Sequence, residues 1–345
     1  MTQPFIVAGE IPVDLAGRRL DQALAELFPD FSRSRLKNWI LSGQARLNDA
    51  PATPRHKVFG GERIEIRAEL EGAIDVEAEP IPLAVIHQDA SILVIDKPAG
   101  LVVHPAAGHA RGTLQNALLH RDPGLAAIPR CGIVHRLDKE TSGLLVVART
   151  LSAHRSLVEQ LRKRTVRREY LALVQGAVTA GGTVDEPIGR HPVDRKRFAV
   201  RAGGREAVTH FRIEERFSHH TLLRVRLETG RTHQIRVHMA HIRHPLVGDP
   251  LYGGRLRLPP HASPALIESL QGFRRQALHA VRLGLEHPET GQAMVWETGL
   301  PEDLASLLDQ LRDDQLVGND KIAGSNFGQR SSPRRGESQG GGEQS

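Results

Sequence analysis

The chain has 345 residues, of which 39% are hydrophobic and 25% charged, so it can bury a sizeable core and we expect two globular units. No run approaches the roughly 20 apolar residues of a membrane span, and the N-terminus lacks a basic region followed by an apolar one; we therefore expect a cytoplasmic protein without a membrane partner. Its 46 Lys and Arg residues outnumber 40 Asp and Glu residues, and the net charge of +6 suits a polyanionic partner.

The first predicted elements are two short amphipathic helices. Apolar residues recur at helical spacing from Leu20 to Leu27 and again from Leu36 to Ile40. Ser32 or Ser34 can serve as the N-cap of the second helix. Cys131, the only cysteine, lies far beyond them in an apolar run, so an internal disulfide is excluded and a buried thiol is expected.

A basic ridge is expected on the second helix. Arg33 and Lys37 are four residues apart and lie away from the apolar stripe, so both are expected to point outward. Residues 45–47 and 63–66 alternate as strands, with a turn at 48–49 after the first of them. These elements predict a small α+β module with a basic helix.

The rest of the chain predicts a larger mixed sheet flanked by helices, between an acidic linker and a disordered tail rich in Gly, Ser, Arg and Gln. The expected strands include residues 92–95, 144–148, 170–174 and 223–227, and the expected helices begin near Thr113, cover Leu157 and follow Pro301. The expected organisation is an N-terminal extension at 1–16, the small module at 17–77, a linker at 78–84, a large domain at 85–316 and the tail at 317–345.

The most informative segment runs from Gly132 to Leu145 and includes the sequence HRLDKETSGLL from His135 onward. It places Asp138 in a polar turn that we expect to lie between two apolar strands, where a rigid scaffold can aim a carboxylate at a ligand. Spacing alone favours an ordinary turn residue, one that caps the turn or pairs with Arg136 or Lys139.

This segment resembles the signature of pseudouridine synthases of the RluA type, in which the aspartate is the essential catalytic residue. Further blocks resemble the same family in the same order, at residues 96–105, 112–118, 168–172 and 230–236. Residues 17–77 resemble the RNA-binding module named after small-subunit ribosomal protein S-four. Residues 183–192 and 245–254 are most similar to the family members that modify large-subunit ribosomal RNA.

The resemblance implies an α+β fold, with a mixed, largely antiparallel central sheet flanked by helices and a small N-terminal α+β RNA-binding domain. It implies that Asp138 is the nucleophile, that Arg236 pairs with its carboxylate and that Tyr170 contacts the uracil ring. A guanidinium beside a partly desolvated carboxylate favours the charged form, and covalent attack requires that form. Tyr170 can stack on the base and help remove the C5 proton, or it can be a core tyrosine of the sheet.

The implied reaction is an isomerisation of uridine, so no cofactor is expected. Attack on the anomeric carbon, attack on C6 and a glycal path all fit these residues. The target uridine must leave its stack, and His135 or Arg136 beside the nucleophile can fill the gap, or can instead support the turn locally. The residues expected to bind RNA are Arg33, Arg35, Lys37, His135, Arg136, Arg231 and His233.

A group of histidines at positions 233, 238, 241 and 244 invites a metal-binding interpretation, because residues spaced i, i+3 can converge on one side of a helix. No nearby Glu completes a His-Glu-x-x-His motif and no cysteine is available, so no metal is expected. We expect these histidines to be surface and RNA-facing side chains, with Ile235, Met239 and Ile242 forming the buried stripe of the helix.

The leading hypothesis is an enzyme that isomerises uridines of 23S ribosomal RNA, either free or in a large-subunit precursor, and acts as a monomer. The sequence indicates no protein partner. The alternative from another class is a non-catalytic RNA-binding factor in ribosome assembly, which basic clusters and the N-terminal module fit equally. The trio of Asp138, Tyr170 and Arg236 favours the enzyme. A hydrolase of the glycosidic bond would need a second acid or a metal-activated water, and neither stands out.

Overall fold

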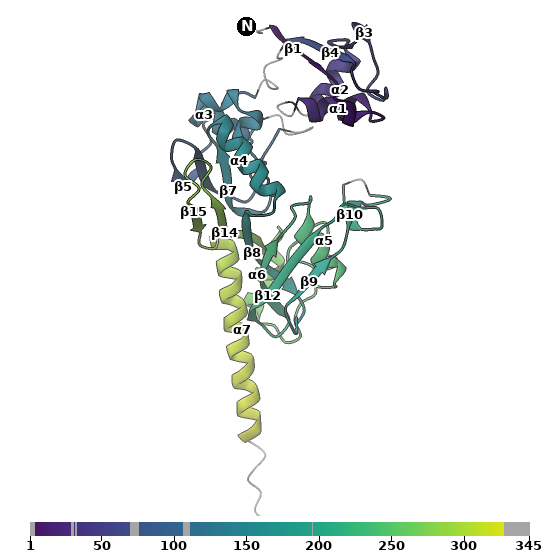
Figure 1. The fold of residues 1–345 in the computed structure, drawn as a ribbon. Helices are drawn as coiled ribbons and strands as arrows, with labels where there is room; N and C mark the ends of the chain where they lie inside the picture. The colour runs from purple at the N-terminus through teal and green to yellow at the C-terminus, as the bar shows by residue number, and fades with distance from the viewer. Residues whose placement is uncertain are drawn as a thin grey trace, which may run out of the picture. The chain divides into compact units, whose positions relative to one another are not determined.

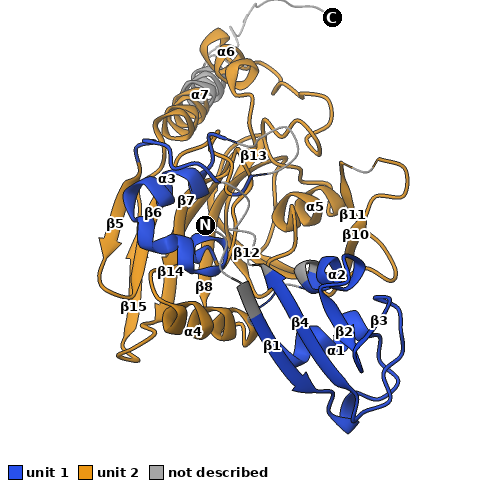
Figure 2. Ribbon diagram, turned by 90° about the horizontal axis from the view of Figure 1, so that it is seen from above, with its two compact units in different colours: residues 1–82, 104–133 blue, residues 83–103, 134–345 orange. Residues whose placement is uncertain are grey.

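The computed structural model describes residues 4–28, 31, 33–69, 76–105, 111–194 and 196–327, with the side chains of residues 4, 5, 34, 35, 69 and 317–327 left aside. The chain divides into two compact units (Figure 2). Unit 1 comprises residues 1–82 and 104–133, and unit 2 comprises residues 83–103 and 134–345.

Unit 1 contains a four-stranded antiparallel sheet in the order β1-β4-β2-β3, accompanied by two helices (Figure 1). Its elements are β1 (Pro4–Glu10), the 3-10 turn η1 (Val13–Leu15), α1 (Leu20–Leu27), α2 (Arg33–Leu41), β2 (Ala45–Leu47), β3 (Ala50–Pro51) and β4 (Arg63–Glu69). The two predicted helices and the two predicted strands are therefore confirmed. β1 lies in the range that the sequence assigns to an extension, and it pairs with β4 along its whole length, so these residues form an edge strand.

The core of this sheet forms because the apolar stripes of both helices face it. Leu20, Leu24, Leu36 and Ile64 have no exposed surface and pack in one cluster. Asn48 and Asp49 both adopt positive φ, at 51° and 64°, which makes the tight turn between β2 and β3 that the sequence predicts.

The second part of unit 1 is helical and comprises α3 (Leu114–Arg121), η2 (Pro123–Ala127) and η3 (Pro129–Gly132). Thr113 caps α3, as expected for a helix that begins there, because its hydroxyl accepts a hydrogen bond from the Asn116 amide. The Asn116 side chain donates to the carbonyl of Glu77, which attaches the segment before residue 83 to α3. The thiol of Cys131 is buried, as predicted, and burial raises its pKa.

Unit 2 is built on a nine-stranded sheet in the order β5-β6-β7-β14-β8-β13-β12-β9, with β15 pairing to β14. β7 and β14 are parallel and the other pairs are antiparallel, so the predicted α+β class with a mixed, largely antiparallel sheet is confirmed. The strands are β5 (Ala84–Gln88), β6 (Ile92–Lys97), β7 (Ser142–Ala148), β8 (Arg167–Gln175), β9 (Gly182–Asp185), β12 (Val208–Arg216), β13 (His220–Leu227), β14 (Leu278–Glu286) and β15 (Ala293–Glu297).

Helices and a small hairpin complete unit 2. They are α4 (Leu151–Arg162), α5 (Gln234–His241), α6 (Pro264–Gly272), α7 (Glu302–Phe327) and the hairpin β10 (Ile188–Arg190) with β11 (Phe198–Val200). α4 packs on β6, β7 and β14 through Ala153 and Leu157, while α6 and α7 pack on β8 through leucines such as Leu270 and Leu308. Among the described residues, no helix is long and apolar enough to cross a membrane.

Two local expectations need correction. The apolar residues Ile133 and Val134 do not form a strand before Asp138, because the backbone is left-handed at Arg130 and Cys131, inside η3, and the chain then runs irregularly. α7 continues to Phe327, so the predicted tail begins inside a helix; residues 328–345 lie outside the described part of the chain.

Candidate active site

Asp138 lies in a tight turn whose carbonyl groups are all engaged. The carbonyl of Asp138 accepts from the amide of Thr141 at 3.0 Å, and that of Glu140 accepts from Arg275 Nη1 at 3.2 Å. The Lys139 carbonyl accepts from the amide of Gly100 and from Lys97 Nζ. Because the turn closes on itself and two of its carbonyls are also held from other parts of the chain, it has one defined conformation.

Lys97 supports this turn from beneath. It has no exposed surface, and its ammonium donates to the carbonyls of Pro98, Leu101 and Lys139 at 2.7–3.0 Å. Burial lowers the pKa of Lys97 to about 8, although the charges of Glu140 and Asp138 oppose this shift. The last residue of β6 thus fixes the turn that carries Asp138.

Gly143 lets the turn continue into the sheet. Its φ is +113°, and a Cβ atom there would lie 2.3 Å from the Ala280 carbonyl oxygen. No other residue type can bring the start of β7 this close to β14. The glycine of the motif is therefore explained by a close backbone approach.

Arg236 connects the carboxylates of Asp138 and Asp249. Its Nη1 lies 3.0 Å from Asp138 Oδ2, while its Nε and Nη2 bind both oxygens of Asp249 at 2.7 and 2.9 Å. The Asp249 side chain is fully buried and also accepts from the amides of Leu251 and Tyr252. Burial opposes the charge of Arg236, but its bonds to Asp249 and the charge of Asp138 raise its pKa, so the guanidinium stays charged.

The carboxylate of Asp138 is held on one side only. Arg236 binds Oδ2, and Nε2 of His233 lies 3.9 Å from the same oxygen. Within the described residues, Oδ1 has no hydrogen-bond partner. The side chain is 16% exposed, so a partly desolvated, oriented carboxylate presents one free oxygen.

Tyr252 organises the far side of Arg236. Its ring lies under the guanidinium, 5.0 Å from the Arg236 Cζ atom to the ring centroid. Its hydroxyl accepts from the amide of Phe198 and lies 2.9 Å from Nδ1 of His233. The ring of His233 packs edge-on against both Phe198 and Tyr252.

Tyr170 is buried on β8, close enough to Asp138 for the carboxylate charge to affect its pKa. Burial raises the pKa of Tyr170, Arg168 opposes the shift and Asp138 adds to it, so the hydroxyl is protonated at neutral pH. Arg168, two residues earlier on the same strand, is also buried. Its Nε finds no partner within the described part of the chain, which leaves a guanidinium beside Tyr170 with unused donors.

The two residues before Leu137 have different environments. Nε2 of His135 accepts a hydrogen bond from the Val146 amide at 3.1 Å, and burial, together with Arg168, lowers the pKa of His135 to about 3. Its ring is thus a neutral support for β7. Arg136 is exposed.

The other residues expected to bind RNA are on separate elements. Arg33 and Lys37 are exposed on α2, and Arg35 lies in α2 with a side chain outside the described set. Arg33 reaches back to the buried carboxylate of Asp21 in α1, so only part of the predicted ridge is free. Arg231, just before α5, donates from Nε to the Glu206 carbonyl.

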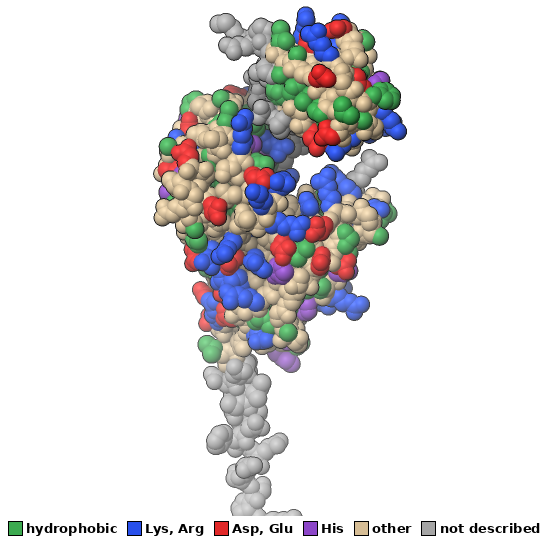
Figure 3. All heavy atoms as spheres, in the orientation of Figure 1, with side chains coloured by type: hydrophobic (Ala, Val, Ile, Leu, Met, Phe, Trp, Pro, Cys, Tyr) green, Lys and Arg blue, Asp and Glu red, His purple; other side chains and the backbone are tan. Residues whose placement is uncertain are grey.

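Basic side chains on unit 2 are interspersed with acidic ones, as Figure 3 shows for one face. Many are paired: Arg164 binds Glu206, and Arg224 binds Glu214. Exposed pairs of this kind contribute at most about 1 kcal/mol each. The surface therefore carries alternating charge as well as net positive charge.

The histidines near α5 do not form a metal site, and no cluster of metal-binding side chains occurs among the described residues. The expectation that all four face outward is wrong for His238, which has no exposed surface. Its Nε2 donates to the Glu186 carbonyl, and its Nδ1 accepts from the hydroxyl of Thr209. His238 is thus a satisfied core residue; Ile235 and Met239 are buried beside it, as predicted.

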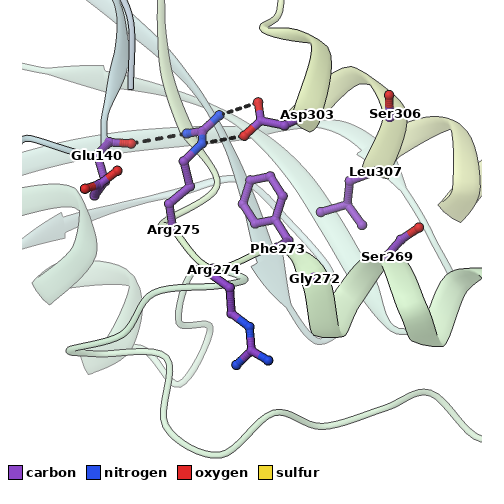
Figure 4. A pocket seen from close by; sticks show the side chains of 9 residues that line it. All are labelled: Glu140, Ser269, Gly272, Phe273, Arg274, Arg275, Asp303, Ser306 and Leu307. Atoms are coloured by element: carbon purple, nitrogen blue, oxygen red, sulfur yellow. Dashed lines mark hydrogen bonds and ion pairs between the residues drawn. The ribbon is translucent and has the colours of Figure 1, made fainter. Parts of the chain in front are cut away.

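A pocket of about 450 Å³ lies between α6, α7 and the Asp138 turn (Figure 4). Its lining residues are Glu140, Ser269, Gly272, Phe273, Arg274, Arg275, Asp303, Ser306 and Leu307. Figure 4 shows Arg275 bridging the carbonyl of Glu140 and the carboxylate of Asp303. The lining includes none of Asp138, Tyr170 and Arg236, so this pocket is distinct from the candidate active site. Its lining residue Arg275 supports the turn through the Glu140 carbonyl.

Sequence reasoning gave no role to Asp249 or Tyr252. Both lie in the block at 245–254 that resembles the family, but their partner Arg236 belongs to another element. The sequence signal that could have found them is the spacing Asp-x-x-Tyr directly after Gly248. Glycine is required at that position, because Gly248 has a φ of +69° and a Cβ atom there would clash with the Arg275 carbonyl.

The chain is similar in sequence to RNA pseudouridine synthases. A family model described as RNA pseudouridylate synthase matches residues 91–241, which include Asp138, Tyr170 and Arg236. The chain is 58% identical over 304 residues to the ribosomal large subunit pseudouridine synthase D of Xanthomonas campestris, with 88% of this chain and 92% of that protein covered. The protein of the same name from Escherichia coli K12 is 54% identical, with 93% and 99% covered.

Solved structures of the same family share the fold. Human RNA pseudouridylate synthase domain containing 1 superposes with a TM-score of 0.51 at 25% identity, covering 67% of this chain and 88% of that one. Human RNA pseudouridylate synthase domain containing 4 gives a TM-score of 0.51 at 26% identity, covering 66% and 93%.

Proposed function

The chain belongs to the RNA pseudouridylate synthase family, and we propose that it isomerises specific uridines of 23S ribosomal RNA to pseudouridine. The observation that supports this most directly is the environment of the Asp138 carboxylate. Arg236 binds its Oδ2, while Oδ1 has no hydrogen-bond partner within the described residues. A covalent catalyst needs such an oriented, charged carboxylate. An RNA-binding factor without catalysis does not need one.

The roles follow from the contacts. Asp138 is the catalytic carboxylate, and Arg236 binds and aims it while Asp249 fixes Arg236. The N1–C1′ bond of uridine breaks, the base turns, and C5 bonds to C1′; the C5 proton is lost and N1 gains one, so the product is an isomer. Tyr170 presents a neutral ring and hydroxyl next to the reacting carboxylate, suited to stacking on the base. No cofactor is needed for this balance.

RNA contact is divided between the two domains in this proposal. The module at 17–77, with Arg33, Arg35 and Lys37, binds the RNA backbone; residues 85–316 hold the target nucleotide, with His135, Arg136, Arg231 and His233 near it. Of these, Arg136 is the exposed side chain beside Asp138 that can occupy the space of a flipped base. The substrate is ribosomal RNA or a large-subunit precursor, and the enzyme works as a cytoplasmic monomer.

The experiment is tritium release from 23S ribosomal RNA that carries 5-tritiated uridine. Wild-type enzyme releases tritium, and Asp138→Asn, which keeps the size of the side chain but removes its charge, releases none. RNA affinity of the variant falls little, because one side chain among many contacts is altered. Wild-type release rates in Asp138→Asn would remove Asp138 from the mechanism.

A further inference from the structure

His233 has an unusual backbone for its residue type. It precedes α5 with φ 58° and ψ 21°, the left-handed region that costs a non-glycine residue on the order of 1 kcal/mol or more. Its side chain does not cap the helix. The conformation instead turns the ring toward Tyr252 on one side and Asp138 on the other.

The hydrogen bonds around Tyr252 favour one tautomer of His233. The amide of Phe198 can only donate, so the Tyr252 oxygen accepts from it at 2.9 Å. Nδ1 of His233 is the only acceptor for the Tyr252 hydroxyl within the described residues, also at 2.9 Å. An unprotonated Nδ1 lets the Tyr252 hydroxyl donate as well as accept, and the ring proton of a neutral His233 then lies on Nε2.

That Nε2–H group faces the catalytic carboxylate. It lies 3.9 Å from Asp138 Oδ2, the oxygen that Arg236 already binds, and the His233 side chain is only 16% exposed. In the other tautomer the lone pair of Nε2 would face the carboxylate anion, and the two would repel each other. The tautomer set by Tyr252 thus decides whether this neighbour attracts or repels Asp138.

We propose that His233 is a positioning residue for Asp138: the Tyr252 hydroxyl holds it as a neutral ring whose Nε2–H dipole, 3.9 Å from Oδ2, keeps Oδ2 turned toward Arg236 and Oδ1 toward the substrate. This deepens the proposed function and rests on it. It differs from a role in RNA binding, because it predicts an effect on turnover and not on affinity.

The β10–β11 hairpin contributes to this arrangement. Phe198 in β11 supplies the amide that occupies the Tyr252 oxygen, and its ring packs edge-on against His233 at 5.8 Å between centroids. Arg190 of β10 lies over the Phe198 ring at 4.9 Å. The hairpin therefore fixes the orientation of the Tyr252 hydroxyl.

Kinetics of four variants on 23S ribosomal RNA test the proposal. His233→Leu removes the Nε2–H group beside Asp138. Tyr252→Phe keeps the ring over Arg236 but removes the hydroxyl that selects the His233 tautomer. Each variant is expected to lower kcat about tenfold to a hundredfold, with KM within about twofold of wild type. His233→Gln, whose amide can still donate, restores part of the loss. His261→Gln is the matched control, because His261 is also left-handed, at φ 61°, but exposed.

A spectroscopic measurement gives a readout independent of turnover. Nitrogen-15 NMR of the histidines in the wild-type protein is expected to show His233 as the Nε2–H tautomer, and Tyr252→Phe to show a mixture. An Nδ1–H tautomer in the wild type overturns the proposal, as does a raised KM with unchanged kcat in His233→Leu. A wild-type enzyme that forms no pseudouridine would instead refute the proposed function, while the tautomer assignment stands or falls by the spectrum.

Discussion

The Asp138 turn in unit 2 and the basic helix α2 in unit 1 differ in the burial of their charged side chains. Arg236, Asp249 and Lys97 are buried, and each makes at least three hydrogen bonds. Lys37 on α2 is exposed and has no ion-pair partner within the described residues. Buried charges with fixed partners are little screened by salt, whereas exposed charges are screened. In the proposed function, the first region therefore serves chemistry and stability, and the second serves RNA affinity.

The largest effect is expected from Asp249→Asn. It leaves Arg236 buried beside a neutral side chain, and removing one partner of a buried ion pair costs about 3–5 kcal/mol. The matched control is Asp303→Asn, because Asp303 binds Arg275 in the same two-pronged way but its side chain is 49% exposed. Urea unfolding measures both. Equal losses in the two variants would contradict the distinction between buried and exposed partners.

A smaller, pH-dependent effect is expected at His135. Its pKa of about 3 lies below the unfolded value of roughly 6.5, so between these values the unfolded chain binds more protons and stability is lost as the pH falls. From pH 7 to pH 5 this histidine should reduce the unfolding free energy by about 1–2 kcal/mol.

Urea unfolding of wild type and His135→Gln at both pH values isolates that contribution. The glutamine carbonyl can replace Nε2 as acceptor for the Val146 amide without titrating. The variant should therefore lose less stability between pH 7 and pH 5 than the wild type. The same loss in both proteins would mean that the ring is not held neutral in the fold.

The smallest effect is expected at the exposed helix. Lys37→Gln should weaken binding of 23S ribosomal RNA a few-fold and reduce the slope of log K against log salt by about 1, with kcat unchanged. Arg33→Gln is less selective, because Arg33 also pairs with buried Asp21 and its loss affects stability. Filter binding across a salt series measures both. A salt slope unaltered by Lys37→Gln would exclude this side chain from phosphate contact.

Local pattern was enough to predict much of the fold. The leucine spacing at 20–27 and 36–40 and the alternation at 223–227 are properties of single segments, and the structure forms α1, α2 and β13 there. The segment before Asp138 does not form the strand that its apolar run predicts, because positive φ at Arg130 and Cys131 is set by tertiary context.

The site was harder to predict because its contacts join distant segments. Asp138 and Arg236 are 98 residues apart, and only the family resemblance suggested that they meet. The partners of Arg236 and of His238 depend on which turns pack together, and no periodicity encodes that. His238 was expected outside for this reason, although Thr209 and Glu186 satisfy its ring inside.

The central claim is tested most directly by mapping pseudouridines in 23S ribosomal RNA from cells that lack this protein. Cells complemented with the wild-type gene are expected to regain specific pseudouridines that Asp138→Asn, expressed at the same level, does not restore. Restoration by Asp138→Asn, or an unchanged pseudouridine map after loss of the protein, would contradict the account.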